Sequence, residues 1–587
     1  IATCMSRPNP VFTDVAWNDV PKSWFDHSHK WEGTSDFSKL IPVYWDYFRP
    51  GDVIKGNLSI FGRSLPLSQP VYGDAFLHVD WFSVPLRLLW KNFTEYITGV
   101  TNRGVPVTHR YPYIPYRMYF DTIGLSVPVN ETDASDPGVF THGSLLDYLG
   151  APTPFSYASQ SGNVWSFTGE VDIQNPLYVW NLDALPFRAY AEIWNEFFRD
   201  EQLQDYIAFY DGDGAEQEQA GSPNTVYGLK TVCAEKDRFT TARPNPQLGE
   251  VASADASYFL KVGSSTFTGV TSTQVQFVSG KPTNLVVNNG SLVLGSSTSV
   301  SNLRAAVTLQ HILEARNVGG FRYFEQVLTD FGVKMSDVRA QRPEFITGDT
   351  VPFMINSVTQ SSPSNGQAND VLGTQAGQGM FNKSTDDVYY EANEDCIVMA
   401  VMFVRPRAFY YQNFRKQLLS GYKFFESGAE QAFFDSTFDK FYNPKLQGLG
   451  DEVVNQYEVA LGSDESLRDP FSVFGYASQY SDWKYRQNEV HGEFRGTLKD
   501  WVYTRDLIDA RGRAAGLTDV VQLSPLDYRH IYAYNLVNGI EESQDYDEMV
   551  KYMLNSSVND HLLFDMSFNL EVRRSLEYYG TPGVGII

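Results

Sequence analysis

The chain has 587 residues, of which 15% are aromatic and 20% are charged, and its formal net charge is −24. This length can bury a sizeable core and corresponds to roughly four domains, although large β proteins often have longer ones. A protein that binds nucleic acid strongly by itself is usually basic, because affinity comes largely from counterion release, so the charge argues against a free-standing DNA-binding protein.

The first predicted elements are strands. Residues 40–63 read as two strands, rich in Val, Ile, Tyr, Trp and Phe, around a turn at Pro50-Gly51. In the second of these strands one face is more apolar than the other, which fits a sheet with only one face fully buried. A longer mixed strand follows at 75–85, and residues 86–99 are predicted to form a short helix.

The next part of the chain is irregular and then helical. Between Tyr111 and Trp180 only residues 143–150 look helical. Residues 185–203 have helical spacing, and their aromatic side chains, such as Trp194, can share one face. We expect this stripe to belong to the core rather than to a cofactor site.

The character of the sequence changes between about Asp205 and Ser301. This range is polar and rich in Gly, Ser, Thr and Asn, with short β alternations among them. It predicts an inserted, solvent-facing β segment. The alternative is a disordered linker, which the repeated β-branched alternation disfavours.

The second half of the chain opens with a predicted helical pair. Residues 303–344 read as a helix, a Gly-Gly break, a second helix that stops at Gly332, and a loop. Strand candidates follow at 350–362, at the nearly all-apolar run 396–406, and at 562–572 with period-two alternation. Strands therefore open and close the chain around long insertions, which indicates a sandwich or barrel.

The cysteines and the apolar runs of the sequence indicate the compartment in which the protein folds. Cys4, Cys233 and Cys396 form neither a CxxC pair nor a disulfide framework, which fits folding in a reducing cytoplasm. The sequence shows no signal peptide and no apolar run of about 18 residues, so we expect neither secretion nor membrane insertion. Because Ile1 precedes Met5, we expect that a few leading residues are missing.

The aromatic content predicts extensive contacts between chains. Aromatic side chains contribute large contact areas to cores and interfaces, and the charged fraction is below the usual value of roughly a quarter for soluble domains. Much of the nominal surface is therefore expected to be covered by partners. The alternative is a large β-rich enzyme with a bigger core.

Two short motifs could bind metal. His27 and His29 share a face only in a strand, and no Cys, Asp or Glu at ligand spacing completes a site. The acidic turn 211–214 resembles a calcium loop, but the required oxygen ligands at the fifth and twelfth positions are missing. We expect no metal at either place, and the common catalytic motifs are absent from the sequence.

Four basic residues near aromatic side chains are candidate nucleic-acid contacts: Lys484, Arg486, Arg405 and Arg407. Aromatic rings can stack on bases while the cations meet phosphates. A similar run lies at residues 113–117. The alternative is that Arg and Tyr are simply common at protein interfaces, and the negative net charge favours it.

Ten blocks along the chain, in order, resemble the major capsid protein of the Microviridae, particularly its gokushovirus-like branch. Any one block would be weak, but their number and order make the resemblance specific. The blocks span residues 24–63, 76–93, 143–152, 189–204, 319–333, 339–345, 372–379, 397–406, 482–494 and 564–583.

The resemblance implies a fold and a function. The implied fold is mainly β, a single eight-stranded antiparallel jelly-roll barrel with large loop insertions that contain helices and short strands. The implied domains are residues 1–205 with the first barrel strands, 206–300 as a variable surface insertion, and 301–587 with the remaining strands. Residues 40–63, 76–84, 396–404 and 562–572 would supply barrel strands.

The implied assembly is a T=1 shell of sixty copies that encloses a circular single-stranded DNA genome, without catalysis or a cofactor. The implied partners are other copies of the chain, the DNA, a small basic DNA-associated protein, a pilot protein, and a host receptor contacted by the insertion. The protein would be part of the virion and assemble in the bacterial host cytoplasm. The alternative is a β-rich carbohydrate-binding protein or glycosidase.

Overall fold

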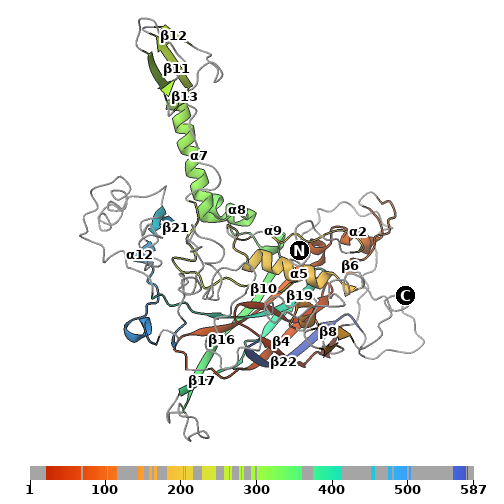
Figure 1. The fold of residues 1–587 in the computed structure, drawn as a ribbon. Coiled ribbons are helices and arrows are strands. Elements are labelled where there is room, and N and C mark those ends of the chain that lie inside the picture. Colours follow the sequence, from red (N-terminus) through yellow and green to blue (C-terminus); the bar gives the residue numbers. More distant parts are fainter. Residues whose placement is uncertain are drawn as a thin grey trace.

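The large sheet of this protein dominates the computed structural model (Figure 1). Eight of its strands, among the described residues, have seven residues or more: β2 (His29–Ser35), β3 (Lys39–Phe48), β4 (Val53–Ser64), β5 (Ala75–Pro85), β16 (Glu344–Thr359), β17 (Gln375–Ser384), β19 (Cys396–Pro406) and β22 (Leu562–Arg574). Three are shorter: β1 (Ser23–Asp26), β10 (Lys230–Thr231) and β18 (Val388–Glu391).

The structure describes residues 22–67, 70–101, 104–114, 143–150, 158–161, 164–167, 182–202, 204, 206–215, 228–245, 257–262, 265–267, 277–278, 281–282, 292–297, 300–359, 375–411, 451–455, 473–478, 481–498, 501–503, 560–576 and 578. The N-terminal Cys4 and most of the basic run 113–117 lie outside these ranges.

The sheet folds into two halves that share β16. In one half β22 pairs with β1, β2 and β4, and β4 pairs with β17 and β18; in the other the order is β5, β19, β3, β10. Up to Phe353, β16 pairs with β5, and from Met354 onward it pairs with β17. The consecutive strands β3, β4 and β5 alternate between the halves, as jelly-roll strands do. The predicted mainly β jelly roll with large loop insertions is confirmed, and its sheet has three short strands besides the eight longer ones.

The first core lies between the two halves. Along β5, Leu77, Val79 and Trp81 point into it, and Phe568 of β22 meets them from the opposite half. The Trp81 and Phe568 rings lie 6.3 Å apart in an edge-to-face arrangement. The period-two alternation of β4 and β22 therefore has the predicted cause, because the other face of each strand is partly exposed.

The second core lies on the outer side of β19. Ile397, Met399 and Val401 pack there in one cluster with α5 (Leu185–Ile193). Since the alternating residues of β19, such as Val398, belong to the first core, both faces of this strand are buried. This explains why its sequence is apolar without interruption, and the predicted buried strand is confirmed.

Two predicted helices differ in detail from the structure. The helix expected at 86–99 is two short helices, α1 (Leu86–Leu89) and α2 (Phe93–Thr98), because Trp90 leaves the helical path and is fully buried. The helix expected at 185–203 is α5 followed by the π-helix η3 (Trp194–Phe198), and the chain is extended at Arg199.

The helical pair projects from the large sheet in Figure 1. It consists of α7 (Val300–Gly319) and α8 (Tyr323–Phe331), followed by α9 (Asp337–Ala340). Gly320 and Gly332 have left-handed backbone angles, as predicted for the break and the stop. Beyond the N-terminal end of α7 lie β11 (Ser257–Val262), β12 (Ser265–Phe267), β13 (Phe277–Val278), β14 (Lys281–Pro282) and β15 (Leu292–Ser297). We call α7 and α8, with these five strands, the arm.

We call the large sheet with its two cores the body. Part of the range 206–300 packs on the body and not in the arm. Lys230 and Thr231 pair with β3, and Val232 and Phe239 are buried. The boundaries of the predicted domains stay a prediction. None of the helices in the described ranges is both long and apolar enough to cross a membrane.

The remaining described elements are short. They are α4 (Leu145–Tyr148), β6 (Tyr113–Ile114), β7 (Ala158–Ser161), β8 (Val164–Phe167), β9 (Leu182–Asp183), β20 (Asp451–Asn455), β21 (Val473–Ser478), α12 (Ser481–Lys484) and η6 (Gly492–Arg495).

Candidate assembly and nucleic-acid surfaces

The four predicted basic residues lie near one loop, residues 233–241. Arg405 and Arg407 are at the end of β19, and the charge of Glu235 acts on the Arg405 guanidinium. Tyr485, between Lys484 and Arg486, interacts electrostatically with Asp237, Glu235 and Arg407. Burial, with these carboxylates, raises the pKa of Tyr485 to about 12. Positions about 80 residues apart in sequence are thus brought together.

Arg405 and Arg407, two of the three arginines of this group, are engaged with protein atoms. The Arg407 guanidinium lies 3.2 Å from Glu235 and 3.5 Å from Asp74. Arg405 lies 4.9 Å from the centre of the Phe403 ring, and burial lowers the pKa of its guanidinium. Lys484 and Arg486, in contrast, are exposed. Only these last two are therefore well placed to meet an external phosphate.

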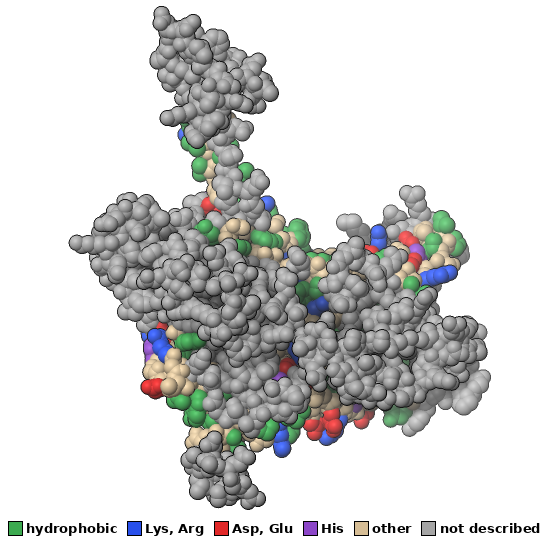
Figure 2. Space-filling model, viewed as in Figure 1, with side chains coloured by type: hydrophobic (Ala, Val, Ile, Leu, Met, Phe, Trp, Pro, Cys, Tyr) green, Lys and Arg blue, Asp and Glu red, His purple; other side chains and the backbone are tan. Residues whose placement is uncertain are grey.

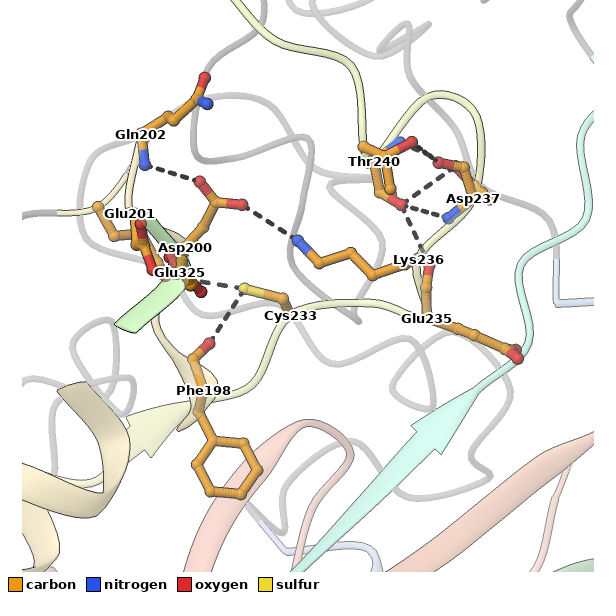
Figure 3. Close-up of polar contacts among 12 residues, drawn as sticks. Phe198, Asp200, Glu201, Gln202, Cys233, Glu235, Lys236, Asp237, Thr240 and Glu325 are labelled. Atoms are coloured by element: carbon orange, nitrogen blue, oxygen red, sulfur yellow. Dashed lines mark hydrogen bonds and ion pairs between the residues drawn. The ribbon is translucent and has the colours of Figure 1, made fainter. Parts of the chain in front are cut away.

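Hydrogen bonds within the loop, and from the loop to Phe198 and Asp200, hold it in place (Figure 3). The Asp237 carboxylate accepts hydrogen bonds from the backbone N–H groups of Phe239 and Thr240, both at 2.8 Å. Lys236 reaches Asp200 at 3.1 Å, and the Cys233 thiol donates to the Phe198 carbonyl at 3.5 Å. Burial raises the pKa of Cys233 to about 11, so this thiol stays protonated near neutral pH.

The two candidate metal motifs have structural roles. His29 stacks on Phe568 with ring centres 4.7 Å apart, whereas His27 faces Asp46 at 3.7 Å, so the two imidazoles do not converge. No group of three or more potential metal-binding side chains occurs in the part of the chain that the structure describes.

Asp213, in the acidic turn 211–214, is a hydrogen-bond hub. Its carboxylate accepts hydrogen bonds from the Trp90 indole at 2.6 Å and from the Asn92 amide at 3.2 Å. His109 lies between Asp213 and Glu95, with its nitrogens 2.5 and 3.1 Å from their oxygens. The hydrogen bond to Asp213, followed by that to Glu95, raises the pKa of His109. The turn thus holds the α1–α2 region.

Comparison with known proteins decides the family. A family model described as capsid protein (F protein) matches residues 13–153 and 113–584 of this chain. The chain belongs to this capsid protein family. Together with the relatives below, this makes it the major capsid protein of a phage of the Microviridae, a structural component of the virion.

Three relatives are similar to this capsid protein over most of their length, and each is named capsid protein VP1. That of Bdellovibrio phage phiMH2K is 26% identical over 520 residues, which cover 83% of this chain and 85% of the relative. That of Chlamydia phage 1 is 26% identical, covering 84% and 88%. That of Spiroplasma virus 4 is 24% identical, covering 84% and 86%.

The capsid protein anchors its arm through a polar elbow, residues 317–325. Arg322 lies at its centre, with its guanidinium 2.6 Å from Glu201, 3.6 Å from Glu196 and 3.7 Å from Glu325. It also donates to the carbonyl of Asn195 at 2.7 Å. One cation therefore joins α8 to η3 and to the segment that follows it.

Further hydrogen bonds fix the same elbow. The backbone N–H of Phe321 donates to Glu201 at 2.7 Å, and the Asn317 amide donates to the carbonyl of Asn245, also at 2.7 Å. Burial, and then the Glu201 charge, raises the pKa of Glu325 to about 7.

Sequence reasoning missed this elbow. The one local signal was Glu325, three residues after Arg322, whose carboxylate accepts from the Arg322 backbone N–H at 3.2 Å as in a capping box. The remaining carboxylates, Glu196 and Glu201, lie more than 120 residues earlier in the chain.

Proposed function

We propose that this capsid protein assembles as sixty copies into a T=1 shell that encloses a circular single-stranded DNA genome. The observation that carries the proposal is the family match along nearly the whole chain, on a jelly-roll sandwich. The two halves of the sandwich bury their own core, so the long loops are available to contact identical neighbours in a closed, symmetric assembly.

The charge of the chain supports a further partner. With a net charge of −24, the shell protein repels phosphate, so a small basic protein is proposed to accompany the DNA. Lys484 and Arg486 are proposed to add local phosphate contacts, with Arg405 and Arg407 beside them. A pilot protein is a further proposed partner, and the host cytoplasm is the proposed place of assembly.

The arm is proposed to contact the host receptor. Its small strands lie beyond the far end of α7, away from the large sheet. Of the proposed domains, 1–205, 206–300 and 301–587, the middle one contributes these strands to the arm and β10 to the body. Deleting residues 257–297 should therefore spare the body, whereas deleting all of 206–300 would remove β10 as well.

Electron cryomicroscopy and mass measurement of the purified particle test the proposal. Sixty copies of this 66.3 kDa chain predict a closed particle with about 4.0 MDa of protein and nuclease-protected single-stranded DNA. A protein that stays monomeric at every ionic strength, or a shell with another number of copies, would contradict it. Particles lacking 257–297 should form normally but adsorb less to host cells, which tests the proposed receptor contact separately.

A further inference from the structure

Helix α8 exposes large apolar side chains to solvent and places a charged side chain against the body. Part of its polar side faces the body, where Glu325 meets Arg322 and Glu201, whereas Thr329 and Asp330 are exposed. Thr329 lies so close to α7 that a β-carbon added at Gly319 would be 2.1 Å from its hydroxyl oxygen. None of the nine residues of α8 is fully buried.

The apolar side of the same helix faces solvent. Tyr323, Phe324, Val327, Leu328 and Phe331 fall on one side of a helix with 3.6 residues per turn, and of these only Phe324 and Val327 are partly buried. Phe331 is 76% exposed, Tyr323 is 70% exposed and Leu328 is 48% exposed. A surface helix normally has the opposite orientation, because apolar burial is the main source of helix stability in proteins.

The exposed apolar surface continues beyond the helix. Val333, Val338 and Phe345 are 55%, 42% and 45% exposed. Inside this surface the Arg342 guanidinium lies between two rings, 4.1 Å from the centre of Phe324 and 4.7 Å from that of Phe197. Figure 2 shows hydrophobic side chains at the surface along α7 and at its base.

The size of this surface fits a specific protein interface. Since an aromatic side chain presents about 150–250 Å², the six exposed residues of α8, the loop after it, α9 and the start of β16 leave roughly 600 Å² of apolar area open to solvent. A standard interface buries about 800 Å² on each partner, and its centre is apolar while its rim is polar. The observed surface is thus large enough to form such a centre.

We propose that a second copy of this chain covers the apolar side of α8. The inference rests on the proposed shell and names one of its contacts. The exposed charges between 323 and 340 are Asp330, Lys334 and Arg339, one net positive charge, whereas the whole chain carries −24. A mildly basic apolar surface complements another, strongly acidic copy.

Replacing Phe331→Asp tests the contact. Because Phe331 is mostly exposed, the variant should fold with an unchanged thermal midpoint, yet form at least about tenfold fewer particles, as expected for an interface hot spot. Phe331→Leu keeps the apolar character and should assemble. Tyr389→Asp places a carboxylate at another aromatic position that is 64% exposed, on β18, and is the matched control.

Two outcomes would overturn the proposal: assembly of Phe331→Asp at the wild-type yield, or an equal loss of particles in Tyr389→Asp. If the wild-type chain itself forms no shell, the proposed function fails before α8 is tested. The two failures are therefore distinguishable.

A photo-crosslinking residue at position 331 supplies a second readout that does not depend on the yield of a variant. In purified particles, ultraviolet light should produce a band of twice the chain mass, and mass spectrometry should identify both parts as this chain. Dissociated subunits at low concentration should give no such band. A crosslink within one chain, or to a different protein, would show that another occupant covers α8.

Discussion

The body and the arm of this capsid protein differ in where their apolar side chains lie. In the body, Trp81 and Phe568 meet between the halves of the sandwich, and β19 is buried on both faces. In the arm, the contacts to the body at the elbow are polar and centre on Arg322 and its carboxylates, while Phe331 and Tyr323 are exposed. The body therefore buries its apolar side chains within one chain, whereas α8 of the arm exposes large apolar side chains to solvent.

This difference indicates when each region reaches its full stability. The sandwich can fold in a single chain, because its apolar residues face one another. The arm is held by a few charged groups, which contribute less per contact when partly exposed. We therefore expect the arm to be the less stable part of the free subunit, and to gain stability on assembly.

The largest expected effect is in the body. Phe568→Ala removes a ring that is 1% exposed and packed against Trp81 and Tyr44, and should lower the free energy of unfolding by about 3–5 kcal/mol. Urea denaturation of the free subunit measures this. Tyr389→Ala, at an exposed position, should change it by less than about 0.5 kcal/mol. Similar losses in both variants would contradict the proposed core.

The next largest effect is at the elbow. Arg322→Met leaves Glu196, Glu201 and Glu325 without their shared cation and should destabilise the docked elbow by about 2 kcal/mol. Hydrogen exchange of residues 321–331 should accelerate while the exchange of β19 stays unchanged. Arg304→Ala, at an exposed position of α7, is the control and should leave both regions unaffected.

A smaller effect is expected from pH. Burial and the Glu201 charge raise the pKa of Glu325 from 4.5 to about 7, so the docked elbow holds a proton that a released elbow would lose above pH 4.5. This contribution to stability is fully present below pH 4.5 and is lost as the pH rises through about 7.

Hydrogen exchange of the elbow, corrected for the intrinsic effect of pH, checks this sign. Opening should be more frequent at about pH 8.5 than at about pH 6. Glu325→Gln should weaken that dependence. Burial and the charge of Glu196 raise the pKa of Glu192 to about 7 as well, so a residual dependence should remain. More frequent opening at the lower pH would contradict the assignment.

The smallest expected effect concerns DNA. Replacing both Lys484→Ala and Arg486→Ala should reduce packaged DNA modestly and make its retention more sensitive to salt, because two phosphate contacts are lost. Arg407→Ala should leave packaging unchanged, since its guanidinium is paired with Glu235 and Asp74. Equal packaging by all variants would favour ordinary interface roles for all four basic residues.

The strands of the body were predictable because their pattern is local. The alternation along β22 and the unbroken apolar run of β19 reflect burial on one face and on two faces. The helix–Gly-Gly–helix pattern of the arm was equally readable, since Gly320 and Gly332 provide the backbone angles that the break and the stop require.

Features that depend on distant residues were not predictable. Trp90 interrupts the expected helix at 86–99 because its indole bonds to Asp213, over a hundred residues later. The pairing of Lys230 with Leu40 assigns part of the polar range 206–300 to the body. The outward direction of the α8 stripe follows from the Arg322 cluster, so periodicity alone would have placed Phe331 in a core.

The position of β16 has a mechanical consequence. This strand is hydrogen-bonded to β5 along its first part and to β17 along its last, and α9 joins it to the arm. A sideways force on the far end of α7 would therefore act through α9 on β16. Because β16 pairs with both β5 and β17, that force would load the hydrogen bonds to both halves of the sheet, with the Arg322 cluster as the nearest contact that resists it.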